Sequence, residues 1–80
     1  MKVLVVDDEK LIRDVIKEYL LLDKMEVVEA SDGEEALECV KKDNFDIIIM
    51  DIMMPKMDGY TACREIKKIK DVPFIILSAR

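Results

Sequence analysis

The chain contains no histidine, only two cysteines, two glycines and two prolines, and no apolar run of membrane-spanning length. Cys39 and Cys63 lack both a histidine partner and a CxxC spacing, so they are not expected to bind a metal. We expect two free, partly or fully buried thiols instead of a disulfide. Only four apolar residues separate Lys2 from Asp7, too few for a secretory signal peptide. These absences predict a cytoplasmic protein without a membrane segment.

What the chain does contain is the composition of a folded globular domain. Its 80 residues are 51% hydrophobic and 39% charged, and no stretch is of low complexity, so disorder is not expected. We expect a single domain over residues 1–80, or the N-terminal portion of one. The net charge is -5, and basic residues are mixed with acidic ones along the whole chain. Because no basic face can be drawn, direct contact with nucleic acid is not expected.

Two kinds of hydrophobic pattern alternate along the sequence and predict four strands and three helices. Short apolar runs, typical of strands buried in a parallel sheet, occupy residues 2–6, 26–30, 46–51 and 73–77. Apolar residues with helical spacing occupy the segments between them, at residues 10–22, about 31–42 and 59–70. This alternation predicts an α/β fold with a parallel sheet, right-handed crossovers and helices on its faces.

The sequence also predicts where two of the helices start and where one loop lies. Ser31 and Glu34 form a predicted capping box, in which each side chain bonds the backbone amide of the other residue. Asp58 is the expected cap of the third helix. Pro55 lacks an amide hydrogen and biases Met54 toward an extended conformation, which predicts a loop over residues 53–57.

Polar residues follow three of the four predicted strands. Asp7 and Asp8 follow the first strand, Asp51 ends the third, and Ser78 follows the fourth. In an open parallel sheet the carboxyl ends of the strands meet at one edge, so we expect the three carboxylates to converge. One interpretation is that they merely cap a helix and end a strand. The pattern favours the other, a Mg²⁺ site in which the cation offsets carboxylate repulsion.

The sequence resembles the receiver domains of two-component response regulators. The resemblance lies in V-L-V-V-D-D-E at the start, D-I-M-M-P-K-M-D-G from Asp51 to Gly59, and F-I-I-L-S-A near the end, and it extends over residues 1–80. It implies a flavodoxin-like parallel sheet of strand order 2-1-3-4-5 with helices on both faces. Pro55 and Gly59 would shape the loop and the helix that follows it.

The resemblance also implies a role for each polar position. Asp51 would be the phosphoacceptor, a carboxylate nucleophile that takes a phosphoryl group from a histidine kinase. Mg²⁺ would be held by Asp7, Asp8, Asp51 and the backbone carbonyl of Met53. Ser78 would bond a phosphoryl oxygen. Such a domain is not an enzyme but a phosphoacceptor that assists its own phosphorylation and dephosphorylation.

The resemblance stops before the family's fifth strand and last two helices, so we expect an incomplete fold. A lysine of that strand pairs with the phosphoryl group in the family, and without it we expect slow or absent phosphorylation of the 80-residue chain. An apolar edge strand at residues 74–77 would favour a homodimer or larger assembly. The alternative function is therefore a self-associating structural half-fold without phosphotransfer. An aspartate-based phosphatase with a D-x-D motif is rejected, because Met53 stands at the second aspartate position.

Overall fold

The computed structural model describes residues 1–54 and 57–77 of the chain. Within them the elements are β1 (Lys2–Val6), α1 (Lys10–Leu22), β2 (Glu26–Ala30), α2 (Gly33–Lys42), β3 (Ile47–Asp51), α3 (Gly59–Ile69) and β4 (Phe74–Leu77). The predicted alternation of strands and helices is confirmed. β3 and β4 each begin one residue later than expected, and α3 ends one residue earlier, with Lys70 as its C-terminal cap.

The four strands form one parallel sheet in the order β2-β1-β3-β4. This order agrees with the one implied by the resemblance, as far as β4. Val6 at the end of β1 pairs with both Ala30 of β2 and Met50 of β3. Continued by one residue, this register places Asp7 beside Asp51. The residues that follow β1 and β3 therefore emerge side by side at the carboxyl edge of the sheet.

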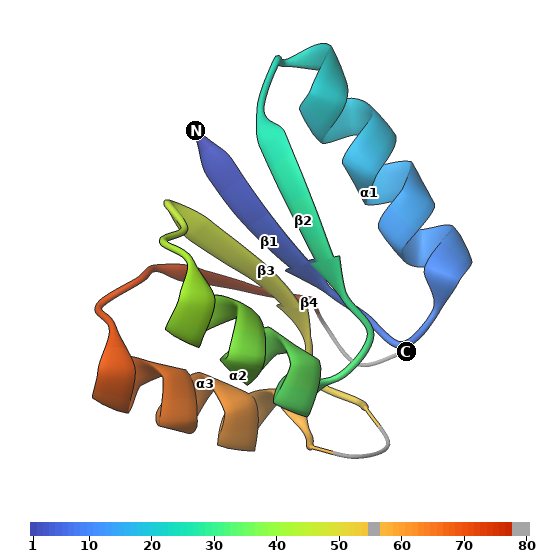
Figure 1. Cartoon of the computed structure of the whole chain (residues 1–80). Coiled ribbons are helices and arrows are strands. Elements are labelled where there is room, and N and C mark those ends of the chain that lie inside the picture. The colour runs from blue at the N-terminus through green and yellow to red at the C-terminus, as the bar shows by residue number, and fades with distance from the viewer. Residues whose placement is uncertain (55–56, 78–80) are drawn as a thin grey trace.

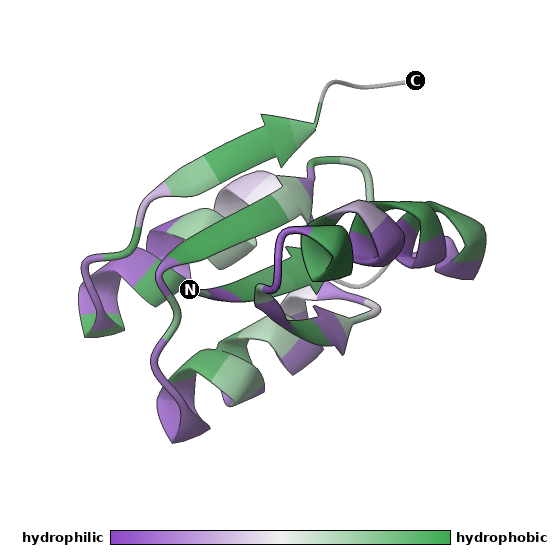
Figure 2. Ribbon diagram, turned by 90° about the horizontal axis from the view of Figure 1, so that it is seen from above, coloured by the Kyte–Doolittle hydropathy of each residue, from purple (hydrophilic) through white to green (hydrophobic). Residues whose placement is uncertain are grey.

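Helices cover both faces of the sheet, with α1 on one face and α2 and α3 together on the other (Figure 1). The main core lies between the sheet and the α2–α3 pair. Its buried members are Leu4, Val6, Ala30, Ala36, Val40, Phe45, Ile48, Met50, Met54, Ala62, Ile66 and Val72. Figure 2 shows that the strands are mostly hydrophobic and that the helices carry both hydrophobic and hydrophilic residues. Apolar burial against this sheet is the main stabilising contribution.

The face of α1 turned away from the sheet is also partly apolar. No residue of α1 is buried, and Leu11, Tyr19 and Leu22 are each at least 70% exposed. On β4, Ile75 and Ile76 are exposed as well. The first helix thus covers only part of its apolar surface, with Ile12, Ile16 and Leu20 half-buried.

The start of α2 corrects the predicted capping box of Ser31 and Glu34. The N-cap is Asp32, whose side chain accepts a hydrogen bond from the Glu35 amide at 2.8 Å. The Glu35 carboxylate reaches back to the Ser31 amide at 3.1 Å and to the Ser31 hydroxyl at 2.8 Å. The cap thus lies one residue later than predicted, because the helix begins at Gly33, and the Glu35 carboxylate accepts from the amide of Ser31, the residue before the cap.

Two other expectations concern the cap of α3 and the cysteines. The Asp58 side chain accepts a hydrogen bond from the Thr61 amide at 2.8 Å and caps α3, as predicted. Cys39 and Cys63 are free and partly buried, also as predicted. Across the described ranges, every helix is too short or too polar to traverse a bilayer.

Candidate functional site

Three aspartates meet at the carboxyl edge of the sheet. Asp7 and Asp8 follow β1, Asp51 is the last residue of β3, and each can offer a carboxylate oxygen within 4.8 Å of the other two. Asp7 and Asp51 are fully buried, whereas Asp8 is exposed. The site is therefore a half-buried acidic cluster that opens to solvent at Asp8. The convergence expected from the strand ends is present in the structure.

Hydrogen bonds hold Asp7 on three sides. Its amide donates to the Ala30 carbonyl at 3.2 Å, which ties it to the end of β2. Its carboxylate oxygen Oδ1 accepts from the Glu9 amide at 2.9 Å. Its backbone carbonyl accepts from Nη1 of Arg13 at 2.7 Å. Because Glu9 is itself the N-cap residue of α1, the Asp7 carboxylate orients the turn before the helix and does not cap the first helical turn.

Asp51 is held by the segment that follows it. Its Oδ1 atom accepts a hydrogen bond from the Met53 amide at 3.2 Å. The next carbonyl along, that of Ile52, accepts from the Gly59 amide at 2.9 Å and so joins the start of α3 to the end of β3. A Cβ atom at Gly59 would lie 2.6 Å from the Asp51 carbonyl oxygen. Gly59 is a shape residue, as expected, because only a residue without a side chain permits this approach.

The donor set of the acidic cluster fits a hard divalent cation. Carboxylate oxygens are the ligands that Mg²⁺ prefers, and one exposed carboxylate leaves room for water or phosphate oxygens. The loop methionines do not compete as ligands, since thioethers suit soft metals. Met54 is buried in the core and Met53 is exposed, which agrees with packing and surface roles for their side chains. Ser78 and Pro55 lie outside the described residues.

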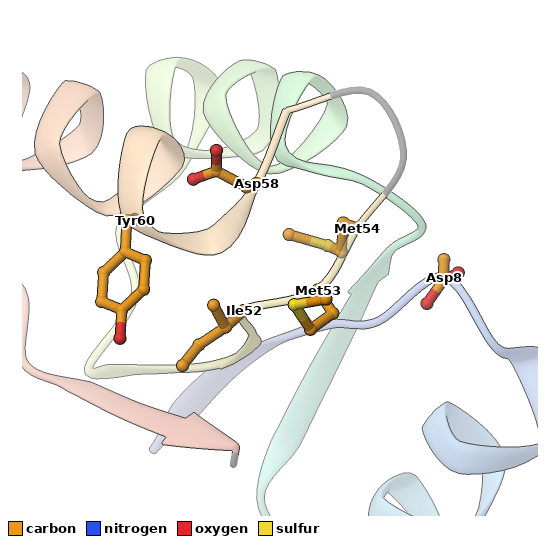
Figure 3. Close-up of a pocket in the computed structure, with 6 residues that line it drawn as sticks. All are labelled: Asp8, Ile52, Met53, Met54, Asp58 and Tyr60. Carbon is orange, nitrogen blue, oxygen red and sulfur yellow. The ribbon is translucent and has the colours of Figure 1, made fainter. Parts of the chain in front are cut away.

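An open pocket of about 580 Å³ adjoins the cluster (Figure 3). It is lined by Asp8, Ile52, Met53, Met54, Asp58 and Tyr60. The Thr61 amide that bonds Asp58 holds the pKa of this carboxyl below its usual value. Ile52 and Tyr60 were not predicted from the sequence as site residues. For Tyr60 the sequence carried one signal, an aromatic residue at an outward position in the first turn of α3. Its side chain is 66% exposed in the structure.

Comparisons with known proteins agree with this geometry. Residues 3–80 match the family described as "Response regulator receiver domain". A probable transcriptional regulator ycf27 of Guillardia theta is 53% identical over 78 residues, which are 98% of this chain and 31% of that protein. The corresponding ycf27 protein of Porphyra purpurea is 47% identical over 78 residues and is covered to 32%. The chain thus spans about a third of the length of these relatives.

Solved structures show the same similarity. The response regulator TrrA from Thermotoga maritima, in complex with Mg²⁺ and BeF, is 43% identical with a TM-score of 0.88. The match covers 94% of this chain and 66% of that one. The receiver domain of a sensor histidine kinase from Pseudomonas aeruginosa, with a magnesium ion in its active site cleft, is 33% identical with a TM-score of 0.92. That match covers 98% of this chain and 66% of the other.

The chain therefore belongs to the response regulator receiver domain family of two-component signalling. Its sheet has the flavodoxin-like arrangement of that family, as the sequence resemblance implied. Receiver domains of this family generally bind Mg²⁺ in an acidic pocket and interact with histidine kinases. In this chain an acidic cluster lies at the ends of β1 and β3.

Proposed function

We propose that this chain is a phospho-accepting receiver domain in which Asp51 takes a phosphoryl group from a histidine kinase. The observation that carries the proposal is the position of Asp51, buried at the end of β3 with Asp7 and Asp8 within 4.8 Å. A buried carboxylate beside two others suits a nucleophile whose charge must be balanced during transfer. The similarity to a sensor-kinase receiver and to transcriptional regulators supports the same role.

Mg²⁺ is the proposed cofactor. Asp7, Asp8 and Asp51 would hold it through carboxylate oxygens, and the backbone carbonyl of Met53 would supply a further ligand. When bound, the ion would neutralise charge on the transferring phosphoryl group and on the carboxylates around it. In a Mg²⁺ titration, we expect the amide resonances of Asp8 and Met53 to shift, and the apparent affinity to fall in Asp51→Asn. No response at millimolar Mg²⁺ would contradict the metal site.

The chemical step uses residues already in place. A carboxylate oxygen of Asp51 attacks the phosphorus of a phosphohistidine, and an O–P bond forms while the N–P bond breaks. The imidazole nitrogen keeps the electron pair of the broken bond, and Asp51 becomes an acyl phosphate. The Met53 amide restricts rotation of the Asp51 carboxylate, so the nucleophile is held in one orientation. Later attack of water on phosphorus would break the bond from phosphorus to the Asp51 oxygen, release inorganic phosphate and restore the carboxylate.

Ser78 is the proposed partner of a phosphoryl oxygen, by virtue of its position directly after β4. The register pairs Asp51 with Leu77, the residue that precedes Ser78, which supports this assignment. The alternative of a purely structural half-fold is less well supported, because the family match and the acidic cluster both favour phosphoryl acceptance. A cytoplasmic location fits this role, since the phosphodonor domain of a kinase must reach Asp51.

Phosphorylation of the protein that carries this chain tests the proposal. Acetyl phosphate or a cognate kinase should add one phosphoryl group in the presence of Mg²⁺, and Asp51→Ala should abolish the gain in mass. Asp14→Asn is the matched control, because Asp14 lies on α1 outside the acidic cluster and forms a local ion pair with Lys10 at 2.9 Å. Undiminished labelling of Asp51→Ala would overturn the proposal.

A further inference from the structure

The guanidinium group of Arg13 contacts the backbone of the acidic cluster at the Asp7 carbonyl. We propose that Arg13, anchored by Glu29, is a positioning residue for the metal-binding aspartate pair, an inference that rests on the proposed Mg²⁺ site. Arg13 lies in the second turn of α1, and Glu29 lies in β2 next to the residue that pairs with the end of β1. Neither would touch the ion or the phosphoryl group. Their role would be to fix the peptide that joins Asp7 to Asp8.

The guanidinium group of Arg13 links α1 to β2 and to the residue that follows β1. Nη1 of Arg13 donates to the Asp7 carbonyl at 2.7 Å, while Nε lies 3.2 Å from Oε1 of Glu29. Only 15% of the Arg13 side chain and 28% of the Glu29 side chain are exposed. The neighbouring Ala30 carbonyl accepts the Asp7 amide at 3.2 Å. Asp7 is therefore fixed on its amide side by β2 and on its carbonyl side by α1.

The Asp7 carbonyl matters because it belongs to the peptide unit between the two carboxylates of the pair. Rotation of this peptide would change the direction of both side chains relative to Asp51. A planar guanidinium presents its donors in a fixed fork, so it can hold a carbonyl and a carboxylate together. A lysine ammonium is a point charge on a flexible stem and does not impose the same geometry. Partial burial limits competition from water and strengthens both bonds.

An electrostatic role and a positioning role for Arg13 predict opposite changes in Mg²⁺ affinity. Arg13 carries a positive charge close to a site for a divalent cation, and that charge alone opposes Mg²⁺ binding. If Arg13 acted only through its charge, Arg13→Gln would tighten Mg²⁺ binding and Arg13→Lys would leave it unchanged. If Arg13 acts by positioning, both substitutions weaken binding. The sign of the change therefore separates the two roles.

The test is a titration of the full chain with Mg²⁺ alone, followed by the amide resonances of Asp8 and Glu9, for wild type, Arg13→Lys, Arg13→Gln and Lys17→Gln. Loss of a residue that orients a metal ligand typically weakens affinity 10- to 100-fold, and we expect about a 10-fold rise in Kd for both Arg13 variants. The Asp8 resonance should also shift in their metal-free spectra. Lys17→Gln is the matched control, because Lys17 pairs with the other oxygen of the same Glu29 carboxylate, at 3.3 Å. Its Kd and its Asp8 resonance should remain those of wild type.

The outcomes are distinguishable. An Arg13→Lys variant with wild-type Kd, or an Arg13→Gln variant that binds more tightly, overturns the positioning role and leaves the proposed function standing. A lower melting temperature without any change in Kd also overturns it. A wild-type chain that does not respond to Mg²⁺ overturns the metal site and this inference together. If Arg13→Gln does not fold, the charge-conserving Arg13→Lys decides between the two roles.

Discussion

Gly59 is the residue at which a single methyl group should disturb both stability and the acidic site. It is the first residue of α3, and its amide is bonded to the Ile52 carbonyl at 2.9 Å. A Cβ atom there would lie 2.6 Å from the Asp51 carbonyl oxygen and 2.7 Å from the Ile52 Cα. Ordinary contacts of a Cβ atom begin at 3.4 Å. Both neighbours are backbone atoms, so relief requires movement of α3 away from the end of β3.

The expected cost of Gly59→Ala follows from two opposing effects. Forcing an extra methyl group into a packed region costs about 1–3 kcal/mol. Alanine recovers up to about 1 kcal/mol through its higher helix propensity. The net loss should be about 1–2 kcal/mol, which in a domain of this size lowers the melting temperature by roughly 4–16 °C. Because the displaced contact is with Asp51 itself, the Mg²⁺ affinity should also fall.

Gly33→Ala provides the comparison. A Cβ atom at Gly33 would lie 2.7 Å from the Met57 carbonyl oxygen, which is an equally tight contact outside the aspartate cluster. Urea unfolding should show a loss of stability for both variants, whereas the Mg²⁺ titration should show weaker binding for Gly59→Ala only. A Gly59→Ala chain with wild-type stability and wild-type Mg²⁺ affinity would show that α3 can move freely, and that the reasoning is wrong.

Three further predictions follow from the caps and the exposed surface. Asp32→Ala should lower the free energy of unfolding by about 1 kcal/mol in chemical denaturation. Glu34→Ala should lower it much less, because it is Glu35 that bonds Ser31. Equal losses for the two variants would instead support the predicted capping box of Ser31 and Glu34. The pKa of Asp58 is lowered, so its stabilising effect is present above the ordinary value of 3.8 and disappears as the pH falls through the lower folded-state pKa. The difference in unfolding free energy between wild type and Asp58→Ala should therefore vanish in acid. A difference that persists in acid would contradict this role of Asp58. The 80-residue chain alone should sediment as a dimer or larger species at low micromolar concentration, because Leu11, Tyr19, Leu22 and Ile75 are exposed; a monomer whose melting is independent of concentration would refute this.

The strand ends and the aspartate convergence could be predicted because they depend on patterns that are local in sequence. β-branched runs identify the strands, and parallel strands necessarily bring their carboxyl ends to one edge. The position of the α2 cap could not be predicted in the same way. Residues 31–35 read S-D-G-E-E, so two overlapping capping boxes fit equally well. Tertiary packing selects between them, since Gly33 is buried closely against Met57.

Arg13 and the apolar pocket were missed for a related reason. Arg13 is one of several charged residues in α1, and nothing nearby in sequence distinguishes it. Its partners Glu29 and Asp7 are joined to it only when β2 packs beside β1. Tyr60 likewise lines a pocket only because the segment after β3, which carries Ile52 and Met53, lies beside it (Figure 3). Such contacts arise from the fold and have no periodic signature.

The central claim is that Asp51 accepts the phosphoryl group, and chemical mapping of the modified residue tests it most directly. The protein that carries this chain would be phosphorylated in Mg²⁺ and then treated with borohydride, which reduces an aspartyl acyl phosphate to homoserine. Peptide mass analysis should find homoserine at position 51 and unchanged aspartate at positions 7 and 8. Homoserine at another position, with Asp51 unmodified, would contradict the account.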